Sequence, residues 1–189
     1  MNGGTLREHL KNATRERHAA LDAFIGSLDT PDTYRGYLRG ISAFRMFVEE
    51  RLAAAPWPDR LGDWQPVRLS EDMKRDLEDL ALHAPSLDLA LDLPSADSTL
   101  GALYVLEGST LGARILAKQV AALGFDETFG ARHLARQAAA VQNWRAFVAG
   151  LDQHSSIDET VASRAACRTF DVAHTAMRMA FQTPFKGSP

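Results

Sequence analysis

The feature that most constrains the fold is residues 98–123, a run of helix length that contains three glycines. Gly101, Gly108 and Gly112 are separated by seven and four residues, so in an α-helix they lie on one narrow face. Because a glycine in a helix interior costs about 0.5 to 1 kcal/mol relative to alanine, three on one face indicate that something approaches the backbone closely. A second helix or a flat ligand would each satisfy this requirement, and the stretch alone leaves both open.

The rest of the chain shows helical periodicity. Apolar residues recur at helical spacing, for example at Leu6, Leu10 and Leu21, and no segment shows convincing strand alternation. Pro31 stands at the favoured first position of a helix, and Gly124 is a helix stop. Long helices joined by short loops predict an all-α bundle that forms a single domain over residues 1–189. The predicted helices span residues 6–24, 31–55, 70–82, 98–123, 134–153 and 156–183, with residues 85–94 as a connection or a weak helix.

Several helix starts are marked by capping residues. Thr5 and Glu8 have the spacing of a capping box, in which the hydroxyl and the carboxylate each satisfy a free backbone amide, and the same spacing recurs at Ser156 and Glu159. Ser70 is predicted to cap the third helix. Either Asp97 or Ser98 is expected to cap the glycine-bearing helix, and Trp57 and Trp64 are expected to anchor a proline-rich loop to the body.

Composition excludes several classes of protein. The 189 residues, 46% of them hydrophobic, are ordinary for one globular domain with a sizeable core. A formal charge of -3 does not suit a nucleic-acid binder, which needs a basic surface to neutralise phosphates. No apolar run is long enough to span a membrane, and the start MNGGTLREHLKN lacks the apolar core of a signal peptide. With Cys167 as the single cysteine, a reducing, cytoplasmic location is expected.

Among the six histidines, His18 has the most informative surroundings. No two histidines have the four-residue spacing of a helical metal site, so a zinc site is not expected. Asp22 follows His18 by one helical turn, where its carboxylate can accept the ring N–H and strengthen the imidazole as a metal ligand. Lys11 lies on the same face. A surface or core role is the alternative for His18, and His174 on the last helix is its competitor as a ligand.

Two further groups have simple structural interpretations. Glu107 and Arg114, seven positions apart on the glycine-bearing helix, are predicted to form an ion pair that supports it. Cys167 can in principle ligate iron as a thiolate, although a buried small thiol is the commoner role of such a residue. The chain contains no Ser-His-Asp elbow, Walker loop or dinucleotide fingerprint.

Two segments together resemble one known family. The first reads LREHLKNATRERHAALD and begins at Leu6, and the second reads LYVLEGSTLGARIL and begins at Leu103. Both resemble the biliverdin-producing heme oxygenases, and the second is most similar to the bacterial members that accompany bacteriophytochromes. The segment TYRGYLRGISAFRMFVEE extends the similarity into the second helix, so the resemblance covers most of the chain. It implies the heme oxygenase-like helical bundle.

The resemblance implies the residues that would hold heme from its two faces. His18 would be the proximal ligand of the heme iron and Asp22 its hydrogen-bonded partner. Lys11 would pair with a heme propionate. Gly108 and Gly112 would be the distal-helix glycines that let the backbone lie almost against the heme.

Further site residues are implied less directly. Arg145, in NWRAFVAGL, falls where the family places an arginine near the propionates, and a guanidinium suits bidentate carboxylate binding; a solvated helix charge is the alternative. Tyr104 lies one place from the tyrosine expected at a propionate, and Phe170 is expected in the pocket wall or in the core. Ser109 is a departure, because many members have an aspartate there that organises water near bound dioxygen. A hydroxyl carries no charge, so the proton-delivery network must be rebuilt around Ser109 and other groups.

The resemblance also implies a reaction. Heme would be both substrate and cofactor, and O2 with electrons from a ferredoxin or reductase would convert it to biliverdin, carbon monoxide and ferrous iron. A bacteriophytochrome would be a candidate acceptor of the biliverdin. Two other interpretations stay open: a heme- or bilin-binding bundle without turnover, and an all-α interaction module or a related helical enzyme that acts on thiamin-like or quinone-precursor substrates.

Overall fold

The computed structural model describes residues 5–152 and 157–182, and within these ranges every regular element is a helix. The predicted all-α class is therefore confirmed. The elements are α1 (Leu6–Ile25), α2 (Pro31–Ala53), the short 3-10 helix η1 (Asp59–Leu61), α3 (Ser70–Asp79), α4 (Ala96–Gly108), α5 (Thr110–Ala121), α6 (Arg132–Ala139), α7 (Val141–Leu151) and α8 (Glu159–Gln182).

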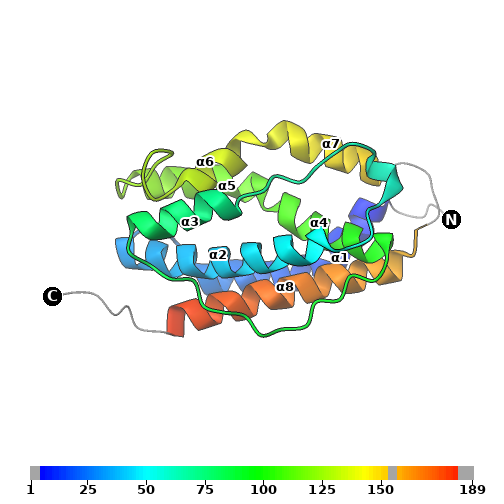
Figure 1. The fold of residues 1–189 in the computed structure, drawn as a ribbon, viewed down its shortest axis with the longest axis horizontal. Helices are drawn as coiled ribbons and strands as arrows, with labels where there is room; N and C mark the ends of the chain where they lie inside the picture. Colours follow the sequence, from blue (N-terminus) through cyan, green and yellow to red (C-terminus); the bar gives the residue numbers. More distant parts are fainter. Residues whose placement is uncertain (1–4, 153–156, 183–189) are drawn as a thin grey trace.

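Helix α8 is the element against which three other long helices pack. It packs against α1, α2 and α4, and a row of buried alanines lines these contacts, including Ala162, Ala166, Ala173 and Ala176. Because alanine side chains are short, the neighbouring helices approach α8 closely. Figure 1 shows α1, α2 and α8 running alongside one another, with α3, α5, α6 and α7 on the other side of α2.

The helix starts agree in part with the predicted caps. Thr5 and Glu8 form the expected capping box at α1. Helix α4 starts earlier than predicted, with Ser95 as its cap, because Ser95 and Ser98 exchange hydrogen bonds between side chain and backbone. Ser70 does not cap α3, since its hydroxyl donates to Glu49 at 2.5 Å instead. The box predicted at Ser156 lies outside the described residues.

The helix predicted over residues 98–123 is wrong in one respect, because it is broken at Ser109 into α4 and α5. The Ser109 hydroxyl donates to the Leu106 carbonyl at 2.6 Å, and Arg45 Nη1 donates to the same oxygen at 3.0 Å. A Gly-Ser pair whose hydroxyl competes for a backbone carbonyl is a recognised cause of a kink. The break therefore has a local cause at Gly108 and Ser109 and a distant support at Arg45.

Other boundaries also differ from the prediction. The segment predicted as one helix over residues 134–153 is two helices, α6 and α7, which meet at Ala140. Helix α3 ends at Asp79 rather than near Leu82, and Ala81 has a positive φ of 52° that is incompatible with a continuing helix. Residues 85–94 are a connection without regular structure.

The predicted ion pair between Glu107 and Arg114 is wrong, because Glu107 points into the protein. Its side chain is 1% exposed and lies 3.9 Å from Arg45, while Arg114 is exposed. Glu107 also accepts hydrogen bonds from the Val67 amide at 3.1 Å and from Asn143 at 3.2 Å. Burial raises the pKa of Glu107 above its ordinary value, while Arg45 and the hydrogen bonds oppose that rise.

The tryptophan-containing loop is anchored as expected. Trp64 packs on Phe147 with ring centroids 4.9 Å apart and donates its indole N–H to the Asn143 carbonyl at 3.1 Å. Trp57 stacks on Trp64. No helix in the described part of the chain is both long and apolar enough to cross a membrane.

Candidate functional site

The three glycines that share a helix face have different surroundings. A Cβ added at Gly101 would lie 2.1 Å from the Ala162 carbonyl oxygen, so this glycine serves close packing of α4 on α8. A Cβ at Gly108 would meet only the edge of Trp144, at 3.9 Å, and one at Gly112 would meet no described atom within 4 Å. The glycine face is therefore covered by a helix at one end and uncovered at the other.

The uncovered end continues as an apolar surface on α5. Leu111 and Ile115 flank Gly112 on this face and are 52% and 63% exposed. Buried residues of α5, Thr110, Ala113 and Val120, lie on its other side. Large exposed apolar side chains beside a bare backbone indicate a surface for an apolar ligand or partner.

A second uncovered stretch lies on α1. The buried residues of α1 are Leu6, Leu10 and Thr14, whereas residues 15–20 are all exposed. Leu6 and Leu10 share one core cluster with Leu100 and Leu103 of α4. These leucines, in the N-terminal parts of α1 and α4, belong to one core cluster, whereas the later parts of α1 and of the α4–α5 pair present uncovered residues.

His18 lies in the exposed stretch of α1 with its ring held on two sides. Nδ1 is 2.9 Å from Asp22 Oδ2, as the one-turn spacing predicts. The edge of Phe170 of α8 packs against the imidazole, with ring centroids 5.6 Å apart. Nε2 has no hydrogen-bond partner among the described residues, and the side chain is 60% exposed. An imidazole whose Nδ1 is hydrogen-bonded and whose Nε2 is free is oriented to bind a ligand through Nε2.

Cationic side chains lie on α1 and on α7. Lys11 lines an open groove of about 560 Å³, together with four other residues of α1, namely Glu8, His9, Asn12 and Arg15. Tyr104 of α4 is half-buried; burial raises the pKa of its hydroxyl, and the nearby positive charge of Arg7 opposes the rise. Tyr104 also packs on Trp144, which precedes the exposed Arg145 on α7. Positive charge and a phenol therefore lie on α1, α4 and α7.

Comparisons with known proteins identify the family. No protein-family model matches the chain. A curated relative, heme oxygenase PigA of Pseudomonas aeruginosa, is 35% identical over 173 residues, which cover 87% of each chain. A crystal structure of the NO- and CO-bound heme oxygenase from Neisseria meningitidis superposes with a TM-score of 0.75 at 25% identity, over 98% of this chain and 96% of that one.

This chain belongs to the heme oxygenase family. The fold-class prediction and the predicted membership of the heme oxygenases are confirmed together, since the relative and the solved structure both span nearly the whole chain. The likeness to the members that accompany bacteriophytochromes stays a prediction. The roles predicted for individual residues of this heme oxygenase remain predictions.

Ser109 of this heme oxygenase is bonded on two sides at the break between α4 and α5. Besides donating to the Leu106 carbonyl, its oxygen accepts a hydrogen bond from Gln137 Nε2 of α6. Gln137 is 5% exposed, whereas Ser109 is exposed. The residue that departs from the family pattern is thus connected to a buried amide that sequence reasoning did not select.

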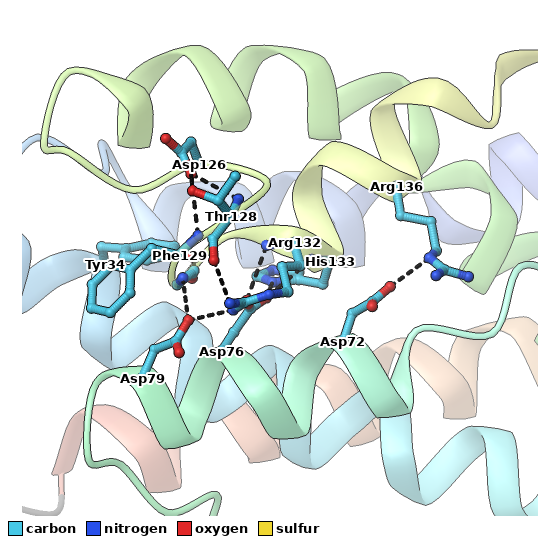
Figure 2. A network of polar contacts seen from close by, with 11 residues as sticks. Tyr34, Asp72, Asp76, Asp79, Asp126, Thr128, Phe129, Arg132, His133 and Arg136 are labelled. Atoms are coloured by element: carbon cyan, nitrogen blue, oxygen red, sulfur yellow. Dashed lines mark hydrogen bonds and ion pairs between the residues drawn. The ribbon is translucent and has the colours of Figure 1, made fainter.

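Helix α6 is in turn anchored to α3 by a buried carboxylate (Figure 2). Asp76 accepts from the backbone amides of Arg132 and His133, both at 3.0 Å, and its Oδ2 is 2.8 Å from His133 Nδ1. Burial by itself raises the pKa of Asp76, but the hydrogen bonds from His133 and Arg132 hold it below its ordinary value. A carboxylate of one helix therefore caps the first turn of another.

No signal in the sequence could have found this connection. Asp76 and His133 are 57 positions apart, and Ser109 and Gln137 are 28 apart, so neither pair shares a motif or a helix. Only the packing of α5 and α3 on α6 brings them together.

The competing ligand candidates of this heme oxygenase have other contacts. His174 packs against Phe24, with ring centroids 5.4 Å apart. The Cys167 thiol lies 3.4 Å from the Ala13 carbonyl and is half-buried between α8 and α1. Among the described residues no group of three or more His, Cys, Asp or Glu side chains could hold a metal ion, so the structure offers no preformed cage of protein ligands.

Proposed function

We propose that this heme oxygenase binds heme between α1 and the α4–α5 pair, with His18 Nε2 as the axial ligand, and opens the ring to biliverdin, carbon monoxide and ferrous iron. Two observations support the proposal: an uncovered glycine face at Gly112 and an imidazole held by Asp22 at His18. Heme requires both, since one face of its iron takes a ligand and its ring needs flat apolar contact.

The residues present fit heme in shape and in donor type. Space at Gly108 and Gly112 admits a flat ring against the helix backbone, and the exposed side chains of Leu111 and Ile115 would supply apolar contact beside it. Asp22 keeps the proton of the imidazole on Nδ1, so neutral His18 offers the lone pair of Nε2. Phe170 limits rotation of the imidazole from the side of α8.

Three residues are proposed to bind the heme propionates. Lys11 lies on the face of His18 and faces an open groove, and Arg145 is an exposed cation on α7. The Tyr104 hydroxyl carries its proton at neutral pH, as a phenol ordinarily does, so it can donate to a carboxylate. Lysine and arginine then hold the two carboxylates by charge-assisted hydrogen bonds.

Bound heme supplies both the iron at which dioxygen is activated and the carbon that is oxidised. The chain's own residues would orient heme and exclude bulk water from it. Gly108 and Gly112, which have no side chains, would let the helix backbone lie close to one face of heme. Ser109 directly follows Gly108, and it is proposed to hold water there.

The proposed partners supply electrons and accept the product. The sequence contains no flavin or iron–sulfur motif, so electrons are proposed to come from a separate ferredoxin or reductase. A bacteriophytochrome is proposed as an acceptor of biliverdin. The cytoplasmic location expected from the single cysteine stays a prediction.

The test is turnover of the reconstituted protein. Hemin-loaded protein supplied with ferredoxin, its reductase and NADPH in air should lose the Soret band and release one carbon monoxide per heme, with biliverdin recovered by chromatography. Loss of the Soret band without carbon monoxide would indicate uncatalysed bleaching and would contradict the proposal.

A second candidate, a heme- or bilin-binding protein without turnover, is favoured by one observation. Ser109 cannot supply the negative charge of the aspartate common at this position. Anaerobic reduction of the hemin complex followed by exposure to air separates the two functions. A return to the unchanged ferric spectrum would support the binding protein, and progress to the biliverdin spectrum supports the enzyme.

A further inference from the structure

We propose that Gln137 is a positioning residue that acts through Ser109, fixing a neutral hydrogen-bond acceptor beside the distal face of heme. This inference rests on the heme site proposed above. It assigns the missing part of the polar network to a buried amide on α6, a helix that contributes none of the residues predicted from the sequence.

The direction of the hydrogen bonds at Ser109 is determined by its partners. The Leu106 carbonyl can only accept, so at 2.6 Å the Ser109 hydroxyl must donate its single proton to it. The amide nitrogen Nε2 of Gln137 can donate a hydrogen bond but cannot accept one, so it donates to Ser109 Oγ. With its proton committed and one lone pair occupied, Ser109 Oγ has one lone pair left, and the residue is exposed.

An acceptor-only oxygen reproduces one property of a carboxylate. A water molecule bound to the free lone pair must donate one proton to Ser109, and its second proton then points elsewhere. Where that second direction is the distal face of heme, the water donates to a ligand there. Ser109 thus orients a donor without carrying charge, and it does so only while Gln137 and Leu106 hold its hydroxyl.

Gln137 is itself held in place by α3. His133 lies one helical turn before it on the same face of α6, and both His133 and Asp76 have fully buried side chains. Asp76 accepts from the first-turn amides of α6 as well as from the imidazole. These bonds hold α6 against α3, and the packing of α5 on α6 brings the Gln137 amide beside Ser109.

Fluoride binding to the ferric hemin complex measures this donor directly, because fluoride is a strong hydrogen-bond acceptor and its Kd is read from absorbance at one pH. Five proteins are compared: the wild type, Ser109→Ala, Gln137→Leu, the double variant, and Gln119→Leu. Gln119 is a matched control on α5, partly buried, whose Oε1 has no hydrogen-bond partner among the described residues.

Ser109→Ala and Gln137→Leu are each expected to weaken fluoride binding by about two- to tenfold, the range of one neutral hydrogen bond. If Gln137 acts through Ser109, the double variant should be no weaker than Ser109→Ala alone, because the two changes remove one shared interaction. Gln119→Leu should bind fluoride as the wild type does. If Gln137→Leu does not fold, Gln137→Asn, which is one methylene too short to reach Ser109, carries the same expectation.

Fluoride affinity unchanged in Gln137→Leu, while Ser109→Ala is weakened, would overturn the inference, and so would a double variant in which the two losses multiply. Hemin titration of the wild type separates the two proposals. A wild type that takes up no hemin overturns the proposed heme site together with this inference, whereas normal hemin uptake with an unaffected Gln137→Leu overturns this inference alone.

Discussion

Helices α4 and α5 carry glycine on the same face and use it in opposite ways. In α4, Gly101 lets the backbone of α8 approach until no side chain fits between the helices. In α5, Gly112 faces no described atom within 4 Å, and its neighbours Leu111 and Ile115 are exposed. The glycine face of α4 is therefore covered by α8, whereas that of α5 is left uncovered.

The junction between the two halves is a buried polar network. Arg45 donates to the Leu106 carbonyl, to the Val67 carbonyl and to Glu49, and it lies beside Glu107. These contacts satisfy the carbonyl that the break at Ser109 leaves without its normal helical partner. The break that separates α4 from α5 therefore depends on Arg45, which is far from both helices in sequence.

The largest effect is expected from Arg45→Leu, which removes the support of the junction. Glu107 would be left buried without its cation, and breaking such a pair costs about 3 to 5 kcal/mol. Urea unfolding of the heme-free protein measures this loss. Arg51→Leu is the control, because Arg51 lies on the same helix with a more exposed side chain, and a loss of similar size there would show that Arg45 has no special role at the junction.

Gly101→Ala tests the packed half. Its Cβ would fall on the Ala162 carbonyl, a backbone atom that cannot move without displacing α8, so overpacking should cost about 1 to 3 kcal/mol. That loss exceeds the gain in helix propensity from replacing glycine. A variant with wild-type stability in urea would show that α4 and α8 are not packed as described.

Gly112→Ala should have the opposite sign in the heme-free protein. Nothing described opposes the new methyl group, so higher helix propensity should stabilise the protein by about 0.5 to 1 kcal/mol. The same methyl group would occupy the space proposed for heme, so hemin affinity should fall. Stabilisation without any change in hemin affinity would break the proposed link between the open glycine and the ligand.

The smallest effect is a change in the pH dependence of stability at Glu107. Burial raises its folded-state pKa, so the stability that this group contributes is full below its ordinary value of 4.5 and is lost as the pH rises through the raised value. Glu107→Gln cannot ionise and should gain on the wild type as the pH rises through this window. Urea unfolding between pH 4 and pH 8 measures the difference, with the exposed Glu127→Gln as control; parallel curves for Glu107→Gln and wild type would contradict the shift.

Local signals predicted the fold well and its interruptions poorly. The Thr5–Glu8 box and Pro31 placed two helix starts correctly because caps depend on residues a few positions apart. The break at Ser109 was missed because half of its cause, Arg45, lies 61 positions from the carbonyl that it satisfies. No feature of the neighbouring sequence predicts the break at Ala140.

The candidate site divides in the same way. The contact of His18 with Asp22 was predictable because four residues make one helical turn, and it is present. The pairing of Glu107 was assigned to the wrong arginine, since a helical spacing of seven offered Arg114 while tertiary packing supplied Arg45. The contacts of Gln137 and Asp76 could not be predicted from the sequence for the same reason, because their partners come from other helices.

The most direct test of the proposed heme site is a hemin titration of the wild type beside His18→Ala, followed at the Soret band, with His174→Ala as the matched histidine control on α8. The wild type and His174→Ala should bind one hemin with the same spectrum. His18→Ala should lose the histidine-ligated spectrum and bind hemin at least about tenfold more weakly, because even an outer partner of a metal ligand is worth about 10- to 100-fold. A His18→Ala protein with the wild-type spectrum and affinity would show that the imidazole on α1 is not the ligand.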